Sequence, residues 1–128
     1  MTKLLIVDDE KNLRALYQAE LGDEGYEVIM ASDGREALRF LESEKPDLVV
    51  LDIRMPGPDG LETMGRMLSQ DNRLPVILNT AYSSYKESFL SWSADAYVVK
   101  SADLTELKTK IREVLAARAA AEKQSGSP

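Results

Sequence analysis

Five polar residues stand at the ends of apolar segments, and their side chains are the ones that could do chemistry together. Asp8 and Asp9 directly follow the first apolar run, Asp52 follows the third, and Thr80 and Lys100 come at the ends of the last two. The chain contains no histidine and no cysteine, which excludes a Ser-His-Asp triad and any imidazole or thiolate zinc site. Any chemistry must therefore use carboxylates, lysine, arginine, hydroxyls or a bound ion.

The apolar runs are typical of strands that are covered on both faces of a sheet. We place these strands at residues 4–7, 26–30, 47–51, 76–78 (ending near Thr80) and 96–99. Segments of helical periodicity alternate with the strands. Their ends are predicted from a C-terminal glycine and from N-terminal capping residues, which are Gly22, Asp33 with Glu36, Asp59, Ser84 with Glu87, and Asp103 with Glu106.

Five strands alternating with five helices predict a doubly wound α/β fold, with a parallel sheet and helices on both faces. In the flavodoxin-like strand order 2-1-3-4-5, the first and third strands are neighbours about 4.8 Å apart. Asp8, Asp9 and Asp52 would then converge, and three close carboxylates repel one another unless a cation lies among them. Mg²⁺ fits such a set of oxygen ligands best, and Lys100 would add a second positive group.

The composition limits the remaining choices. A chain of 128 residues with 44% hydrophobic residues is expected to form one compact domain. Its net charge of −6 argues against direct binding of nucleic acid. The sequence shows neither a secretion leader nor a run of about 18 apolar residues, so we expect a cytoplasmic protein without membrane contact.

The span from about Leu4 to Leu115 resembles a response-regulator receiver domain of bacterial two-component systems, of the kind found in chemotaxis regulators. The resemblance is spread over several short motifs, and their occurrence together in this order is specific. The motifs are Ile6-Val7-Asp8-Asp9-Glu10, Ser32-Asp33-Gly34 with Ala37-Leu38, Asp47-Leu48-Val49-Val50-Leu51-Asp52 with Met55-Pro56 and Asp59-Gly60, Thr80-Ala81, and Tyr97-Val98-Val99-Lys100.

The resemblance implies that Asp52 is a phosphoacceptor, which takes its phosphoryl group from the histidine of a sensor kinase or phosphotransfer protein. It further implies a Mg²⁺ ion bound directly by Asp9 and Asp52, largely through water by Asp8, and by the backbone carbonyl of Arg54. Self-catalysed phosphotransfer and autodephosphorylation are implied, in place of an enzyme that turns over a substrate.

The resemblance also assigns the other strand-end residues. Lys100 and the Thr80 hydroxyl would stabilise the transferring phosphoryl group. After phosphorylation, Thr80 would move toward a new oxygen and Tyr97 would turn inward, which would change the surface formed by the fourth helix, the fifth strand and the fifth helix. Taken alone, each residue also has a simpler interpretation. For Tyr97 it is packing, since an aromatic residue in a strand is more often a packing residue.

The sequence departs from the family where a proline usually follows the lysine of the fifth strand, because Ser101 stands there. A cis bond before a residue other than proline costs about 2.5–4 kcal/mol. We therefore predict a trans Lys100–Ser101 peptide and an altered path into the fifth helix.

Three other functions remain open. A phosphorylation-independent docking domain would keep the fold and lose the ion. An aspartyl-phosphate phosphatase commonly has a second Asp two positions after the nucleophile, where this chain has Arg54. A flavin or nucleotide module is disfavoured, because no G-x-G-x-x-G or Walker lysine motif is present.

The domain is expected to span residues 1–118, followed by a disordered tail or start of a linker at 119–128. The alanine-rich stretch from Ala116 to Ala121 could prolong the last helix, whereas residues 122–128 have the polar composition of a disordered end. We favour a stand-alone receiver over a piece of a longer regulator. The downstream effector is unknown, and a phosphorylation-dependent dimer is compatible with the sequence.

Overall fold

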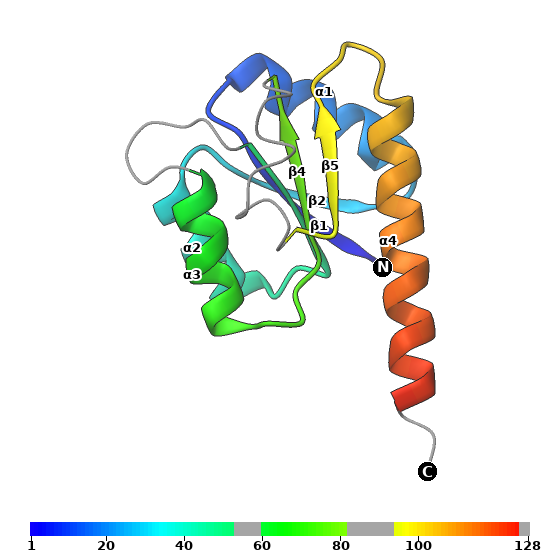
Figure 1. The fold of residues 1–128 in the computed structure, drawn as a ribbon. Coiled ribbons are helices and arrows are strands. Elements are labelled where there is room, and N and C mark those ends of the chain that lie inside the picture. Colours follow the sequence, from blue (N-terminus) through cyan, green and yellow to red (C-terminus); the bar gives the residue numbers. More distant parts are fainter. Residues whose placement is uncertain (53–59, 82–93, 126–128) are drawn as a thin grey trace.

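Five short strands form one parallel sheet in this computed structural model, which describes residues 1–52, 60–81 and 94–125 (Figure 1). The sheet order is β2-β1-β3-β4-β5, and each neighbouring pair is parallel. The predicted strand order is therefore confirmed. The strands are β1 (Lys3–Val7), β2 (Glu27–Ala31), β3 (Leu48–Leu51), β4 (Val76–Thr80) and β5 (Ala96–Val99).

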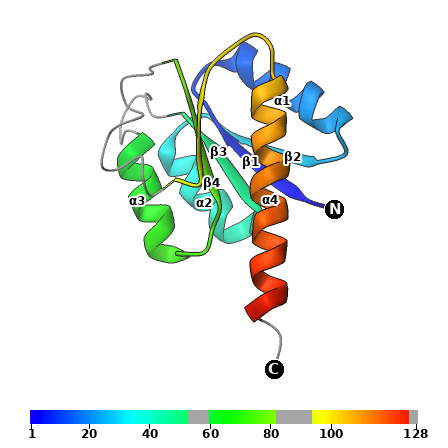
Figure 2. The same ribbon diagram turned by 45° about the vertical axis from the view of Figure 1, so that its right-hand side comes forward.

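Helices cover both faces of this sheet, as the alternation of elements predicts (Figures 1 and 2). The described residues form α1 (Lys11–Asp23), α2 (Gly34–Glu44), α3 (Gly60–Gln70) and α4 (Thr105–Ser125). The helix expected to start at Ser84 lies outside the described residues, so the last helix, expected as the fifth, is α4. The doubly wound fold class is confirmed.

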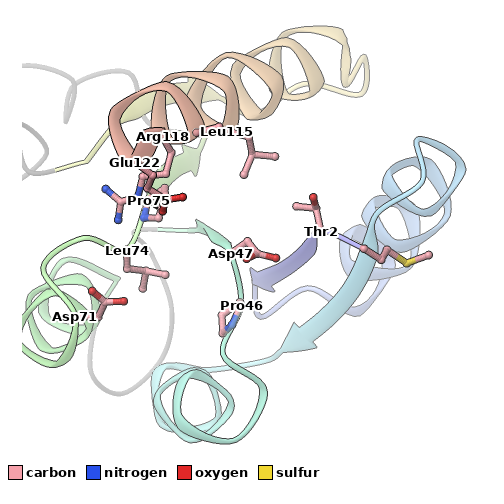
Figure 3. A pocket seen from close by; sticks show the side chains of 11 residues that line it. Thr2, Pro46, Asp47, Asp71, Leu74, Pro75, Leu115, Arg118 and Glu122 are labelled. Carbon is pink, nitrogen blue, oxygen red and sulfur yellow. Dashed lines mark ion pairs between the residues drawn. The ribbon is translucent and has the colours of Figure 1, made fainter. Parts of the chain in front are cut away.

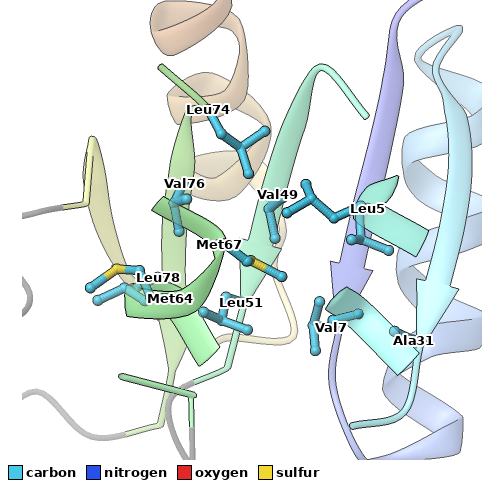
Figure 4. Packing of buried hydrophobic residues seen from close by; sticks show 12 residues of the cluster. Leu5, Val7, Ala31, Val49, Leu51, Met64, Met67, Leu74, Val76 and Leu78 are labelled. Carbon is cyan, nitrogen blue, oxygen red and sulfur yellow. The ribbon is translucent and has the colours of Figure 1, made fainter. Parts of the chain in front are cut away.

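Two hydrophobic clusters fill the space between the sheet and the helices. Because side chains alternate along a strand, residues of odd and even position on β1 and β3 belong to different clusters. Leu5, Val7, Val49 and Leu51 pack against α2 and α3, where Met64 and Met67 also lie (Figure 4). The opposite face packs against α1 and α4 through Leu4, Ile6, Leu48, Val50, Ile77, Val98, Tyr17, Leu21, Leu104, Leu107 and Ile111.

The helix ends follow the sequence signals in one case and depart from them in another. Asp33 accepts a hydrogen bond from the Glu36 amide at 2.9 Å, which confirms the predicted N-cap of α2. The Glu36 carboxylate accepts from the Ser32 amide at 2.9 Å, one residue before the position that a capping box uses. The predicted cap at Gly22 is wrong, because α1 continues to Asp23 and the residue with left-handed backbone is Gly25, with φ of 95°. The amide of Gly25 bonds to the Gly22 carbonyl, and the amide of Tyr26 bonds to the carbonyl of Leu21. These two bonds form a Schellman motif, which requires the glycine one position after the C-cap.

The last helix is longer than expected. It extends through Ser125, so the alanine-rich stretch prolongs the helix and residues 119–125 are helical instead of disordered, while the domain boundary at residue 118 stays a prediction. Alanine has the highest helix propensity, and the alanine-rich segment at 116–121 continues the helix into the polar residues after it. The far half of α4 extends beyond the strands (Figure 1). An open cleft there separates Leu115 and Arg118 from Pro46 and Asp47 at the start of β3 (Figure 3).

Candidate functional site

The carboxyl ends of the parallel strands bring the predicted chemical residues to one edge of the sheet. β1 and β3 pair with Val7 opposite Leu51, so the next residues, Asp8 and Asp52, are neighbours. The amide of Asp52 donates a hydrogen bond to the Val7 carbonyl at 3.0 Å, so the hydrogen bonds between β1 and β3 continue one residue past the end of β3. The predicted convergence of the two buried aspartates is therefore confirmed.

Lys100 bridges the two aspartates. Its ammonium nitrogen lies 2.7 Å from Oδ2 of Asp8 and 2.8 Å from Oδ2 of Asp52. Asp8 is 1% exposed and Asp52 is 5% exposed, so the ion pairs are shielded from water. Burial alone lowers the pKa of Lys100, but its hydrogen bonds with Asp52 and Asp8 outweigh burial and raise that pKa above the ordinary lysine value. The ammonium therefore stays protonated at neutral pH.

Asp9 completes the acidic set from the solvent side. Carboxylate oxygens of Asp8, Asp9 and Asp52 lie within 4.8 Å of one another, and Asp9 is exposed. With Lys100 protonated, the four groups keep an excess of two negative charges, which favours a cation. A set made only of oxygen donors fits a hard divalent cation, so these residues can hold a metal ion.

The orientation of Asp8 is fixed by the start of α1. Its Oδ1 accepts a hydrogen bond from the Glu10 amide at 2.9 Å, and its backbone carbonyl accepts one from Nη1 of Arg14 at 2.8 Å. Arg14 was not predicted to contribute to the site. It lies one turn into α1, so the helix that follows the acidic pair also holds it in place.

Thr80 and Tyr97 lie on the face of the sheet that packs against α2 and α3. Thr80 is fully buried, and its backbone carbonyl accepts a hydrogen bond from the Lys100 amide at 2.7 Å. Tyr97 is partly buried and packs against the cluster on that face, which also contains Leu78. The structure thus places Thr80 beside the site and Tyr97 on the adjacent edge strand. Arg54, the remaining predicted ligand, lies outside the described residues.

The junction after β5 follows the prediction. The peptide between Lys100 and Ser101 is trans, as no cis bond occurs in the ranges that the structure describes. The Ser101 hydroxyl accepts a hydrogen bond from the Asp103 amide at 3.1 Å, and Asp103 in turn accepts one from the Thr105 amide at 2.9 Å. Serine and aspartate hydrogen bonds thus lead the chain into α4 without a proline.

A buried polar pair beneath the site was not predicted. Nδ2 of Asn79 donates a hydrogen bond to the Tyr17 hydroxyl at 2.9 Å. The available signal was the asparagine itself, since it interrupts the apolar run of β4. Tyr17 gave no signal, because a tyrosine on the apolar stripe of a helix is ordinarily a packing residue.

Comparison with known proteins agrees with this geometry. The model of the "Response regulator receiver domain" family matches residues 4–112. The chain belongs to this family. The receiver domain is 38% identical over 115 residues to the alkaline phosphatase synthesis transcriptional regulatory protein PhoP of Bacillus subtilis, covering 88% of this chain and 48% of PhoP. It is also 38% identical over 117 residues to the regulatory protein AtoC of Escherichia coli, covering 90% of this chain and 25% of AtoC. The chain thus spans half or less of the length of these relatives.

Solved structures give the same assignment. The response regulator protein TrrA of Thermotoga maritima, in complex with Mg²⁺-BeF, superposes with a TM-score of 0.86 at 47% identity, covering 89% of this chain and 99% of TrrA. TrrA in complex with the histidine kinase ThkA gives a TM-score of 0.85 at 48% identity, with 90% and 99% coverage. Among the described residues, no helix of the receiver domain has the length and apolarity needed to cross a membrane.

Proposed function

We propose that this receiver domain accepts a phosphoryl group on Asp52 from the phosphohistidine of a histidine kinase or phosphotransfer protein, in a reaction that depends on Mg²⁺. The observation that carries the proposal is the position of the Asp52 carboxylate, beside two further acids and 2.8 Å from a buried ammonium group. The similarity to TrrA, which has been determined both with Mg²⁺-BeF and with a histidine kinase, supports it.

In the proposed reaction a carboxylate oxygen of Asp52 forms a bond to phosphorus, while the bond from phosphorus to the donor imidazole nitrogen breaks. The imidazole nitrogen keeps the electron pair and takes up a proton. Charge in such a transfer is spread over the equatorial phosphoryl oxygens, so the protein acts mainly by placement and electrostatics. Asp8 and Asp52 hold the Lys100 ammonium at the site, where it would neutralise part of that charge.

Asp8, Asp9, Asp52 and the backbone carbonyl of Arg54 are the groups that would hold Mg²⁺. When bound, the ion supplies positive charge for the phosphoryl oxygens and relieves the repulsion among the three carboxylates. Mg²⁺ usually binds through one or two carboxylates together with phosphate oxygens and water, and the exposed Asp9 leaves the cluster accessible from solvent.

The proposed response to phosphorylation uses Thr80 and Tyr97. Thr80 would hydrogen-bond to a phosphoryl oxygen, and Tyr97 would turn further inward, which changes the surface of β5 and α4 for a downstream effector or a second receiver. Their common face of the sheet and the partial burial of Tyr97 support this. We place the receiver domain at residues 1–118 of a cytoplasmic protein, since the buried positions of α4 end at Ile111 among the described residues.

Labelling with acetyl phosphate tests the proposal. The wild type should be labelled with Mg²⁺ and not in EDTA, and Asp52→Asn should not be labelled. Asp23→Asn is the matched control, because it makes the same change at an exposed aspartate at the end of α1. Labelling of Asp52→Asn at the wild-type rate would exclude Asp52 as the acceptor, and a wild type that is never labelled would favour the docking domain. Continuous hydrolysis of small phosphate esters would favour the phosphatase.

A further inference from the structure

The hydrogen bond between Tyr17 and Asn79 is unusual because it joins two polar side chains inside the hydrophobic core. Tyr17 is 1% exposed and Asn79 is 3% exposed, and the bonded atoms are 2.9 Å apart although the residues are 62 positions apart in the sequence. A buried amide and a buried hydroxyl must each find a partner, since an unsatisfied polar group costs its full desolvation energy. Apolar residues would fill this space without such a requirement.

Asn79 lies beside the phosphoacceptor of the proposed function. β3 and β4 pair with Leu51 opposite Leu78, so one further step of the register places Asp52 beside Asn79. Both side chains point to the face of α1 and α4, because each comes two residues after a member of the cluster on that face, Val50 or Ile77. Adjacent parallel strands are about 4.8 Å apart, so the Asn79 amide is within reach of the Asp52 carboxylate.

Tyr17 approaches the same place from α1. The helix starts directly after the acidic pair, and Arg14, one turn before Tyr17, already holds the Asp8 carbonyl. Burial raises the pKa of the Tyr17 hydroxyl, its bond with Asn79 opposes that rise, and the charges of Lys100, Asp8 and Asp52 also act on this group. The hydroxyl is therefore in the electrostatic field of the site and, at neutral pH, is a neutral acceptor for the Asn79 amide.

We propose that Tyr17 is a positioning residue that holds the Asn79 amide away from Asp52. This inference rests on the proposed function of Asp52 as phosphoacceptor. Without the Tyr17 hydroxyl, the Asn79 amide turns to the carboxylate beside it and donates to Asp52. That bond competes with Mg²⁺ and Lys100 for the carboxylate oxygens and must break before the carboxylate attacks phosphorus.

Removing the acceptor of this hydrogen bond should affect phosphorylation differently from removing its donor. Tyr17→Phe leaves the Asn79 amide in place without its acceptor, so phosphorylation by acetyl phosphate should slow about tenfold, since a hydrogen bond to a charged group must be broken. Asn79→Leu removes the same bond together with the competing donor, so the rate constant should stay within about twofold of wild type. Both substitutions should lower the urea midpoint. Tyr17→Phe leaves the buried Asn79 amide without its acceptor, and Asn79→Leu leaves the buried Tyr17 hydroxyl without its donor.

Mg²⁺ affinity, measured by calorimetry, is a second readout that does not depend on phosphorylation. It should weaken in Tyr17→Phe and not in Asn79→Leu. The double variant Tyr17→Phe with Asn79→Leu should recover the wild-type rate and affinity. If Asn79→Leu alone does not fold, the double variant replaces it in the comparison with Tyr17→Phe. Tyr26→Phe is the matched control, because Tyr26 packs on the same cluster just before β2, at the opposite end of the sheet.

Equal slowing in Tyr17→Phe and Asn79→Leu would overturn the inference and assign the pair a purely structural role. Unchanged rate and Mg²⁺ affinity in Tyr17→Phe would overturn it as well. If the wild type is not labelled, the proposed function of Asp52 fails, whereas the Mg²⁺ affinities of the two variants still decide whether Tyr17 positions Asn79.

Discussion

Removal of the Lys100 ammonium tests the electrostatics of the site directly. In Lys100→Met the apolar stem is kept and the charge is lost, so Asp8 and Asp52 remain buried without the cation that lies 2.7 and 2.8 Å from them. Together with Asp9, the site then holds three carboxylates within 4.8 Å. We expect the free energy of unfolding to fall, and to fall most when no divalent cation is present.

The size of this loss follows from the distances and the burial. At 2.8 Å and an effective dielectric constant of about 20, the attraction in each ion pair is about 6 kcal/mol before desolvation. Desolvation offsets much of this attraction, but breaking a buried pair by removing one partner costs about 3–5 kcal/mol. A loss of that size is a large part of the 5–15 kcal/mol by which domains are typically stable.

The assay is urea unfolding of wild type and Lys100→Met, each in EDTA and in millimolar Mg²⁺. We expect Mg²⁺ to stabilise the variant more than the wild type, because the ion binds three uncompensated carboxylates and favours the folded state by mass action. The matched control is Lys108→Met. Lys108 also contacts two carboxylates, Glu20 at 3.0 Å and Glu24 at 3.6 Å, but the side chains of these acids are 43% and 38% exposed, so the loss should be small and independent of Mg²⁺.

Two results would refute this reasoning. If Lys100→Met lost no more stability than Lys108→Met, the bridge between Asp8 and Asp52 would not be a buried ion pair in solution. If the loss were the same in EDTA and in Mg²⁺, the three carboxylates would not form a cation site.

Three further predictions concern single residues. Asp9→Asn should weaken Mg²⁺ binding by about tenfold or more in calorimetry with little change of stability in EDTA, and an unchanged affinity would exclude Asp9 as a ligand. Gly25→Ala should lower the free energy of unfolding by about 1 kcal/mol, because an L-residue is strained at positive φ and the added Cβ meets nothing within 4 Å. Gly22→Ala should instead raise it by about 0.5–1 kcal/mol, and urea titrations giving the same sign for both would contradict the assignment of the cap. Asp33→Ala should cost about 1 kcal/mol and accelerate hydrogen exchange of the Glu36 amide, and an unchanged exchange rate of that amide would show that the cap is not formed.

The order of the sheet was predictable because strand and helix patterns alternate in the sequence, and this alternation leaves few arrangements of a parallel sheet. The ends of the helices were less predictable. The sequence pattern predicted a cap at Gly22, whereas the positive φ of Gly25 and the hydrogen bonds of the Schellman motif place the capping glycine three residues later. At the C-terminus, the helix propensity of the alanines at 116–121 indicated a longer helix, but the polar composition after them did not show that α4 continues through Ser125.

The site was predictable where it depends on strand ends and not where it depends on packing across the sheet. Asp8, Asp52 and Lys100 each follow a strand, and the carboxyl ends of parallel strands share an edge. The sequence did not show that one lysine would bridge both acids. Nor did it show that Tyr17 bonds to Asn79, since no local pattern relates two residues that meet through the packing of a helix on a sheet.

The extension of α4 beyond the strands has a mechanical consequence. Side chains packed on the core anchor the first part of the helix as far as Leu115, and the 10 further residues to Ser125 make an arm about 15 Å long at 1.5 Å per residue. A tilt of about 5° at the anchored part would displace the end of this arm by about 1 Å, which is the size of helix shifts that carry signals in other proteins. The same tilt changes the width of the cleft between Leu115 and Arg118 and the start of β3 (Figure 3). A small rearrangement next to β5 would therefore give a larger displacement at the opposite end of the domain.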